Sequence, residues 1–305
     1  MSFSQNAKVE ITKRKISKPC CRLAACYGIA CFGKYFDNRG LVLQTETEEV
    51  AKFALKTFHS LGVEGTVLCK ERPNGAIYEF SVSHPKEVER MMKLLDCTGT
   101  ETNLRIRPQL LQCGNCLRTF VAAAFLCGGT ITDPEKTYQL EFISNRYNLS
   151  RDFEALLAEH EFRPRRTQRK GTNIVYIKAS ESIEDLLVFM GAQNAAMVMM
   201  DRKIYKDTNN KNNRLNNCEN ANNMKRDKAT QKVQQAIRLL DEEGLLSDLP
   251  QPLQEAAQKR LAYPQYTLAQ LAESFDPPIS KSGLSHRLKK LEELARTAAV
   301  RRENV

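Results

Sequence analysis

The sequence predicts an α+β protein, in which a duplicated domain of helices and strands precedes an all-α domain. Three observations predict this fold class. A residue pattern recurs about 96 positions apart in the first part of the chain, an asparagine-rich segment follows it, and only helical periodicity follows that segment. A chain of 305 residues is long enough for two domains that each bury a core.

Each copy of the repeat opens with a helix of small and apolar residues. The first, CCRLAACYGIACFG, runs from Cys20 to Gly33, and the second, CLRTFVAAAFLCGG, runs from Cys116 to Gly129. A helix that is apolar on nearly every face must be buried, and small side chains let two backbones approach closely. We therefore expect the two helices to pack against each other.

The elements after each opening helix recur in the same order, as a strand, a helix, a β-hairpin and a short closing helix. The hairpin turns are expected at Asn74-Gly75 and near Lys170-Gly171, because glycine accepts the left-handed backbone that tight turns require. The expected ranges are 41–47, 48–63, 65–83 and 86–95 in the first copy, and 138–144, 149–162, 163–180 and 181–190 in the second.

This doubled unit resembles the LAGLIDADG homing endonuclease fold, in which two halves meet along such a helix pair and their sheets form a saddle over DNA. For active members the resemblance implies an acidic residue at or beside the closing glycine of each helix, where the pair holds divalent metal ions for phosphodiester hydrolysis. The corresponding positions here are Phe32 or Gly33 and Gly128 or Gly129, and none carries a carboxylate. We therefore expect no catalytic residue, no bound metal and no cofactor. The alternative is a metal-dependent DNA endonuclease.

Two matched aspartates, Asp37 and Asp133, lie about four residues beyond the helix ends. They stand beside turn-forming residues, where an aspartate more often caps a turn than binds a metal. We expect both to be turn residues.

The segment from Asp201 to Met224 has the composition of an asparagine-rich linker. Within it, NRLNNCENAN from Asn213 to Asn222 resembles NR-x-x-NCE-x-AN, the bridge motif of the WhiA family of bacterial regulators, and this resemblance favours an ordered junction. We expect a degenerate LAGLIDADG-like domain at 1–205, with repeats at about 20–105 and 113–200. A bridge at 206–231 and a helix-turn-helix domain at 232–305 would follow.

The part after the bridge is helical throughout. A long amphipathic helix is expected from Lys225 to a stop at Gly244, and a second lies between Pro252 and Pro264. A third, short helix has Thr267 as its N-cap, and the proline pair at 277–278 ends it. A short helix, a tight connection and a basic helix form a helix-turn-helix arrangement.

The last helix, from Ser280 to Ala295, has an apolar stripe and a basic outer face. Helical spacing predicts that the stripe is buried and consists of Leu284, Leu288, Leu291 and Ala295. The residues expected to face base edges are Lys281, Ser282, Ser285, His286 and Lys289, and those placed for phosphates are Arg287 and Lys290. With Thr267 they are the candidate DNA-binding residues. The alternative is a solvated basic face on a structural helix.

SKSGLSHRLKKL, within this helix, is similar to the WhiA family signature SKSG-[VI]-NHRL-[RK]-K-[IL], from which Leu284 and Ser285 depart. The CC pair, the AAAFLCGGTITDP stretch and the NCE-x-AN bridge also occur in family order, so the resemblance covers nearly the whole chain. It implies a DNA-binding regulator without nuclease activity, with roles in transcription regulation, cell division and chromosome segregation.

The net charge of +10 favours a polyanionic partner, because each neutralised phosphate releases counterions. The expected partner is double-stranded DNA, with another regulatory protein as a second partner of the LAGLIDADG-like domain; an interaction scaffold is the further alternative. No secretory signal or bilayer-length apolar stretch is visible, so we expect a cytoplasmic, nucleoid-associated protein without membrane contact.

Ten cysteines without an export signal are expected to be thiols. Cys113-x-x-Cys116 and the pair Cys20-Cys21 stand at corresponding places in the two copies, which raises the alternative of a four-thiolate zinc site. Adjacent cysteines do not easily direct both sulfurs to one ion, and cysteines at the start of buried helices often only fill space. We therefore favour thiols without metal, an expectation that stoichiometric zinc would contradict.

A second basic segment, RPRRTQRK from Arg163 to Lys170, lies in the hairpin of the second copy. It has two interpretations of equal weight. The segment either follows a DNA backbone or forms a charged edge strand that discourages pairing between sheets.

Overall fold

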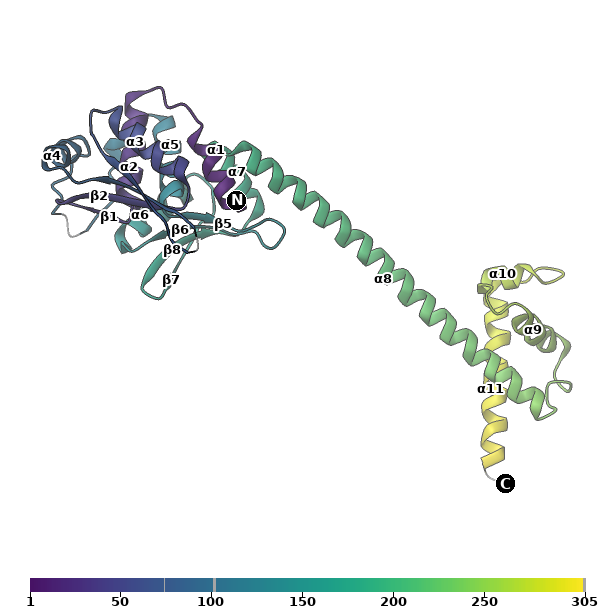
Figure 1. Ribbon diagram of the computed structural model, residues 1–305. Coiled ribbons are helices and arrows are strands. Elements are labelled where there is room, and N and C mark those ends of the chain that lie inside the picture. Colours follow the sequence, from purple (N-terminus) through teal and green to yellow (C-terminus); the bar gives the residue numbers. More distant parts are fainter. Residues whose placement is uncertain (74, 101–102, 304–305) are drawn as a thin grey trace. The chain divides into compact units, whose positions relative to one another are not determined.

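The computed structural model describes residues 1–73, 75–100 and 103–303 (Figure 1). It divides into two compact units, Met1–Asp207 and Thr208–Val305. Each unit has a hydrophobic core of its own. No helix among the described residues is both long and apolar enough to span a bilayer.

The first unit contains two four-stranded antiparallel sheets that share one topology. The strand orders are β1-β2-β4-β3 and β5-β6-β8-β7, so each strand of the first copy has a counterpart in the second. This identity confirms the duplication that the sequence predicts. The bounds are β1 Tyr35–Asp37, β2 Gly40–Thr45, β3 Thr66–Lys70, β4 Ile77–Val82, β5 Gly129–Ile131, β6 Leu140–Ser144, β7 Arg165–Arg169 and β8 Thr172–Ile177.

The helices of the first unit recur in the same way, and Figure 1 shows α2, α3 and α5 on one side of the strands. Every helix expected from the repeat is present. Helix α1 and the three-residue strands β1 and β5 were not predicted. The bounds are α1 Phe3–Thr12, α2 Pro19–Phe32, α3 Glu48–His59, α4 Pro85–Leu94, the 3-10 turn η1 Pro108–Leu110, α5 Gly114–Gly128, α6 Tyr147–Glu159 and α7 Ser180–Met190.

The hairpin turns agree with the prediction where they are described. Lys170 and Gly171 have φ angles of 49° and 80°, the left-handed backbone expected of a tight turn. Gly75 has a φ of 119°, and its partner in the expected turn, Asn74, lies outside the described residues.

The two central helices, α2 and α5, are in close contact, as their small residues predict. A Cβ atom placed on Gly28 would lie 2.7 Å from both the Ala123 Cβ and the Phe120 carbonyl oxygen, so only glycine fits at this crossing. The Tyr27 and Phe120 rings stack beside it, with their centroids 5.3 Å apart. The helix pair therefore forms the centre of the first core.

The asparagine-rich segment is helical. It belongs to α8, Gln193–Glu242, a helix of 50 residues that begins well before the predicted start at Lys225. Nearly all side chains from 207 to 229 are exposed, so no buried face supports this part of the helix. The ordered junction favoured by the NCE-x-AN motif is thus a solvated helical segment.

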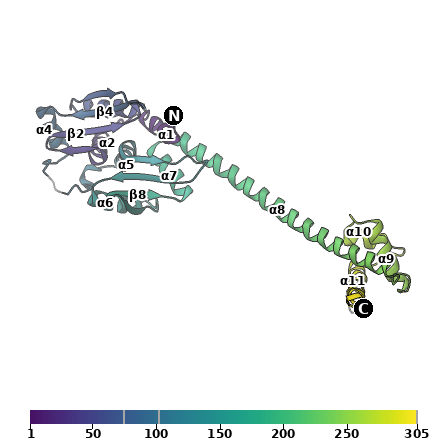
Figure 2. The same cartoon turned by 60° about the horizontal axis from the view of Figure 1, so that its bottom comes forward.

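The second unit is the predicted helical domain, in which α9, α10 and α11 surround the end of α8 (Figure 2). The helices are α9 Gln251–Ala262, α10 Leu268–Glu273 and α11 Lys281–Glu303. The predicted stripe of α11 is buried, namely Leu284, Leu288, Leu291 and Ala295. A helix-turn-helix unit requires the burial of this stripe, because the buried stripe determines which face of α11 remains accessible.

Candidate nucleic-acid interface and basic pocket

A pocket of about 340 Å³ lies where α2 and α5 end. Phe32, Gly33, Gly128 and Gly129 line it, and these are the positions where the LAGLIDADG resemblance places metal-binding acids. Among the described residues that line the pocket, none carries a carboxylate. Its lining therefore offers hydroxyl, amide and backbone oxygens but not the paired carboxylates that hold divalent ions in active LAGLIDADG nucleases.

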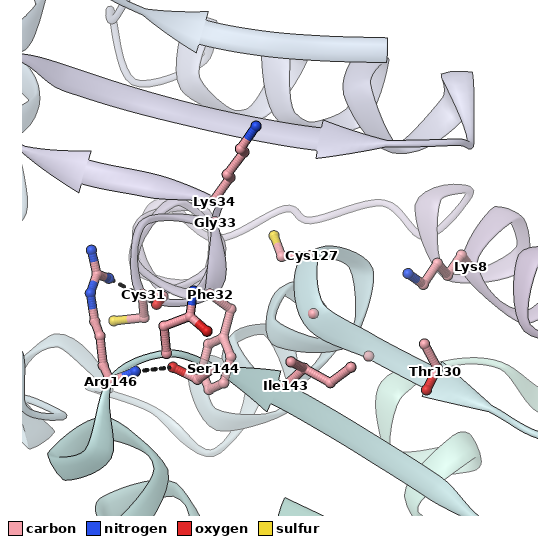
Figure 3. Close-up of a pocket in the computed structure, with 13 residues that line it drawn as sticks. Lys8, Cys31, Phe32, Gly33, Lys34, Cys127, Thr130, Ile143, Ser144 and Arg146 are labelled. Atoms are coloured by element: carbon pink, nitrogen blue, oxygen red, sulfur yellow. Dashed lines mark hydrogen bonds between the residues drawn. The ribbon is translucent and has the colours of Figure 1, made fainter. Parts of the chain in front are cut away.

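Three cationic side chains line the pocket instead, Lys8, Lys34 and Arg146 (Figure 3). They come from α1, from the residue pair after α2 and from the loop before α6. Burial lowers the pKa of both Lys8 and Arg146. These residues were not candidates in the sequence, because they are far apart along the chain and belong to no motif.

Arg146 occupies the carboxyl end of α2. Its guanidinium donates hydrogen bonds to the carbonyl oxygens of Ala30, Cys31 and Phe36 at 3.4, 3.1 and 3.0 Å. A fixed cation at this end of a helix satisfies free carbonyl groups and interacts favourably with the helix dipole. Arg146 also repels any divalent cation that would enter the pocket.

The two matched aspartates serve as turn residues, as expected. Asp37 Oδ1 accepts a hydrogen bond from the Arg39 backbone N–H at 2.7 Å, and its carboxylate pairs with the Arg39 guanidinium at 3.0 Å. Asp133 Oδ1 accepts one from the Glu135 backbone N–H at 2.9 Å. Neither aspartate lines the pocket.

The candidate DNA-binding residues of the sequence lie in the second unit, mostly on the first three turns of α11. Ser285 and Arg287 are half-buried. Ser285 and Lys289 line a cavity of about 260 Å³ together with Val233 of α8, so this side of α11 is turned partly toward α8. The exposed candidates are Lys281, Ser282, His286, Lys289 and Lys290.

The amino end of α11 is capped by Ser280. Its Oγ accepts a hydrogen bond from the Gly283 backbone N–H at 3.0 Å and lies 3.1 Å from the Ser282 Oγ. The remaining free N–H groups and the exposed Lys281 make this helix end favourable for an anion.

Three exposed side chains of α11, Lys281, His286 and Lys289, form no ion pair within the part of the chain that the structure describes. Lys290 lies 3.5 Å from Glu293, and the Arg287 guanidinium stacks 5.6 Å from the centroid of the buried Phe275 ring.

Thr267 caps α10, as predicted from its position. Its Oγ1 accepts a hydrogen bond from the Gln270 backbone N–H at 3.3 Å, and the Gln270 side chain accepts one from the Thr267 backbone N–H at 3.0 Å. This capping box fixes the helix that precedes the turn.

Four cysteines converge at the opposite end of the central helix pair. The sulfur atoms of Cys20, Cys21, Cys113 and Cys116 all lie within 4.8 Å of one another. The hydrogen bond with the Cys116 thiol and the backbone N–H groups there lower the pKa of Cys113 to about 6, whereas burial raises that of Cys21 to about 12. The sequence raised the convergence of both pairs as an alternative, and the structure brings the four sulfurs together.

Two α/β halves joined at a carboxylate-free helix pair, followed by a helical unit with a basic last helix, define a LAGLIDADG-like protein with a helix-turn-helix domain. The chain matches the family models described as WhiA LAGLIDADG-like domain over residues 117–209 and WhiA C-terminal HTH domain over residues 212–295. It belongs to the WhiA family.

The relatives extend over the full chain. Similar proteins include one from Alkaliphilus oremlandii, 32% identical over 312 residues and 97% of each chain. Another, from Alkaliphilus metalliredigens, is 30% identical over 97% of this chain and 98% of its own. Both are named "Probable cell division protein WhiA".

A solved structure has the same fold. Full-length DUF199/WhiA from Thermotoga maritima superimposes with a TM-score of 0.61 at 18% sequence identity, covering 97% of this chain and 99% of that chain. This similarity supports the α+β fold class with its terminal helical unit.

Proposed function

We propose that this protein is a regulator that binds double-stranded DNA with a sequence preference, through the helix-turn-helix unit. The observation that carries the proposal is the exposed face of α11 on which three side chains have no ion-pair partner among the described residues. Lys281, His286 and Lys289 lie on its amino-terminal turns, the part of a recognition helix that enters the major groove.

The DNA contacts divide into two kinds. Lys281, Ser282, Ser285, His286 and Lys289 are the proposed readers of base edges, which discriminate between sequences. Arg287 and Lys290, with the first turn of α10 held by Thr267, are the proposed phosphate contacts, which supply affinity and orientation. The free N–H groups at the start of α11 add to the phosphate contacts.

The proposal includes the absence of nuclease activity. The pocket at the ends of α2 and α5 is lined by cations and by no carboxylate among the described residues, so it is electrostatically opposed to a divalent ion. A role in cell division is proposed from the names of the relatives. Roles in transcription regulation and chromosome segregation, at the nucleoid in the cytoplasm, are proposed with it because they depend on the same DNA binding.

A direct test uses the full-length protein with a library of duplexes and with plasmid DNA. We expect binding by fluorescence anisotropy that weakens steeply with salt, enrichment of one motif on repeated selection, and plasmid that stays uncut with Mg²⁺ or Mn²⁺. A protein that ignores duplex DNA at low ionic strength would refute the DNA-binding role. Chelator-sensitive cleavage would refute the absence of nuclease activity separately.

A further inference from the structure

The amino ends of the central helix pair bring four sulfur atoms together. Cys20 and Cys21 belong to the first turn of α2, Cys113 is the N-cap of α5, and Cys116 lies in its first turn. The Cys113 sulfur lies 3.8 Å from that of Cys20, 3.7 Å from that of Cys21 and 3.5 Å from that of Cys116. The sulfurs of Cys21 and Cys116 are 3.9 Å apart.

We propose that these four cysteines bind one zinc ion as thiolates. A tetrahedral site with Zn–S bonds of about 2.3 Å has sulfur atoms about 3.8 Å apart, from the geometry of a tetrahedron. Four of the six separations are between 3.5 and 3.9 Å, and the other two are below 4.8 Å. The sulfurs thus already stand near the corners that zinc requires.

Two other sulfur chemistries fit this geometry less well. A disulfide needs its sulfurs at about 2.05 Å, so one bond would pull two of the four together and leave the other two without a role. An iron–sulfur cluster distributes its four cysteines over two or four iron atoms, so cysteines on different irons have sulfurs farther apart than those on a single ion. One mononuclear, thiophilic ion uses all four side chains at once.

The adjacency of Cys20 and Cys21 is the main objection, because consecutive helical residues point about 100° apart. Both lie in the first turn of α2, where no preceding turn restricts the side-chain rotamers. The Cys113 sulfur is almost equally distant from the two, at 3.8 and 3.7 Å. An ion on the α5 side of this turn can therefore be reached by both residues.

The surroundings favour the negative charge of four thiolates. Two helix amino ends converge on the cluster, and each carries a positive partial charge. The backbone N–H groups of Asn115 and Cys116 are directed at the Cys113 sulfur, and the Arg14 guanidinium interacts electrostatically with Cys21. Such N–H donors and cations are the partners that stabilise thiolate ligands in metal sites.

The site would be structural. Four protein ligands leave no open coordination position, which is the arrangement of structural zinc and not of catalytic zinc. Cys21 and Cys116 are buried, whereas Cys20 and Cys113 are half-buried, so an ion can enter from solvent. The ion would fasten α2 to α5 at the end opposite the basic pocket.

Elemental analysis of the purified full-length chain tests the proposal, using protein prepared under reducing conditions and without chelator. We expect about one zinc per chain, restored after removal and dialysis against Zn²⁺. The variant Cys113→Ser with Cys116→Ser should hold about tenfold less zinc. The matched control, Cys69→Ser with Cys218→Ser, changes two exposed cysteines outside the cluster and should retain it. Equal zinc in all three proteins, or none in the unaltered chain, would overturn the proposal.

Cobalt binding provides a readout that needs no variant. Co²⁺ titrated into the zinc-free, unaltered chain should give the intense visible and thiolate charge-transfer absorption of a tetrahedral four-sulfur site, saturating at about one ion per chain. Weak octahedral spectra would contradict the site. So would alkylation mass spectrometry that finds Cys21, Cys113 or Cys116 in a disulfide in anaerobically prepared protein.

Discussion

Two basic segments of this molecule have similar composition and use their charges differently. In β7, Arg166 lies 3.0 Å from Glu154 and 4.7 Å from the Tyr147 ring centroid, and Arg169 lies 3.4 Å from Glu141. On the first turns of α11, by contrast, the exposed lysines at 281 and 289 meet no acidic partner in the described part of the chain. A run of basic residues therefore does not indicate a binding surface until its partners are known.

The position of β7 explains the difference. It is the edge strand of the sheet β5-β6-β8-β7, where charged side chains discourage pairing with another sheet. Arg166 also ties this edge to α6 through Glu154. The structure thus supports the edge-strand interpretation for Arg166 and Arg169, while Arg165 is exposed and forms no ion pair with the described residues.

The largest expected effect comes from removing two base-reading side chains of α11. His286→Ala with Lys289→Ala should lower affinity for the selected DNA site by about 30-fold or more, since each good base contact contributes about 1–3 kcal/mol. Affinity for unrelated DNA should fall much less. Fluorescence anisotropy with both duplexes measures the difference, and circular dichroism checks that the helices persist.

The matched control is Arg165→Ala, which removes an exposed charge from β7. It should leave the discrimination between the two duplexes unchanged. If it reduces specific affinity as much as the α11 variant does, the contrast between the two segments is wrong.

Removal of a single phosphate contact is expected to have a smaller effect on DNA affinity. Lys290→Ala should weaken binding to target and unrelated duplexes about equally, and it should reduce the slope of log affinity against log salt by about 0.9. Titrations at several salt concentrations give the slope. A loss confined to the target duplex would instead make Lys290 a reader of bases.

The local residue pattern was sufficient to predict the parts of the fold that depend on local geometry. The burial of Leu284, Leu288 and Leu291 follows from helical spacing, and the contact at Gly28 follows from small residues on a helix that is apolar on nearly every face. The missed helix α1 does have a local signal, the capping box of Ser2 and Gln5. The strands β1 and β5 have three residues each, too few for an alternating pattern to appear.

The two ends of the central helix pair could not be predicted in the same way. The basic pocket collects Lys8, Lys34 and Arg146 from three separate elements, and only the folded chain brings them together. The four cysteines are visible in the sequence as a possible site, but the directions of adjacent residues on one helix argue against it. Only the folded chain shows that Cys113 lies within 3.8 Å of both members of the adjacent pair.

The smallest effect is expected in β7, and it concerns stability and not binding. Arg166→Ala removes an ion pair whose side chains are 23% and 31% exposed, together with the contact to the Tyr147 ring. The free energy of unfolding should fall by about 1 kcal/mol, because partly exposed pairs contribute little and the ring contact adds a similar amount. Urea denaturation measures this change. DNA affinity should stay the same, since the guanidinium is already engaged by Glu154, and a clear loss of affinity would show that β7 also touches DNA.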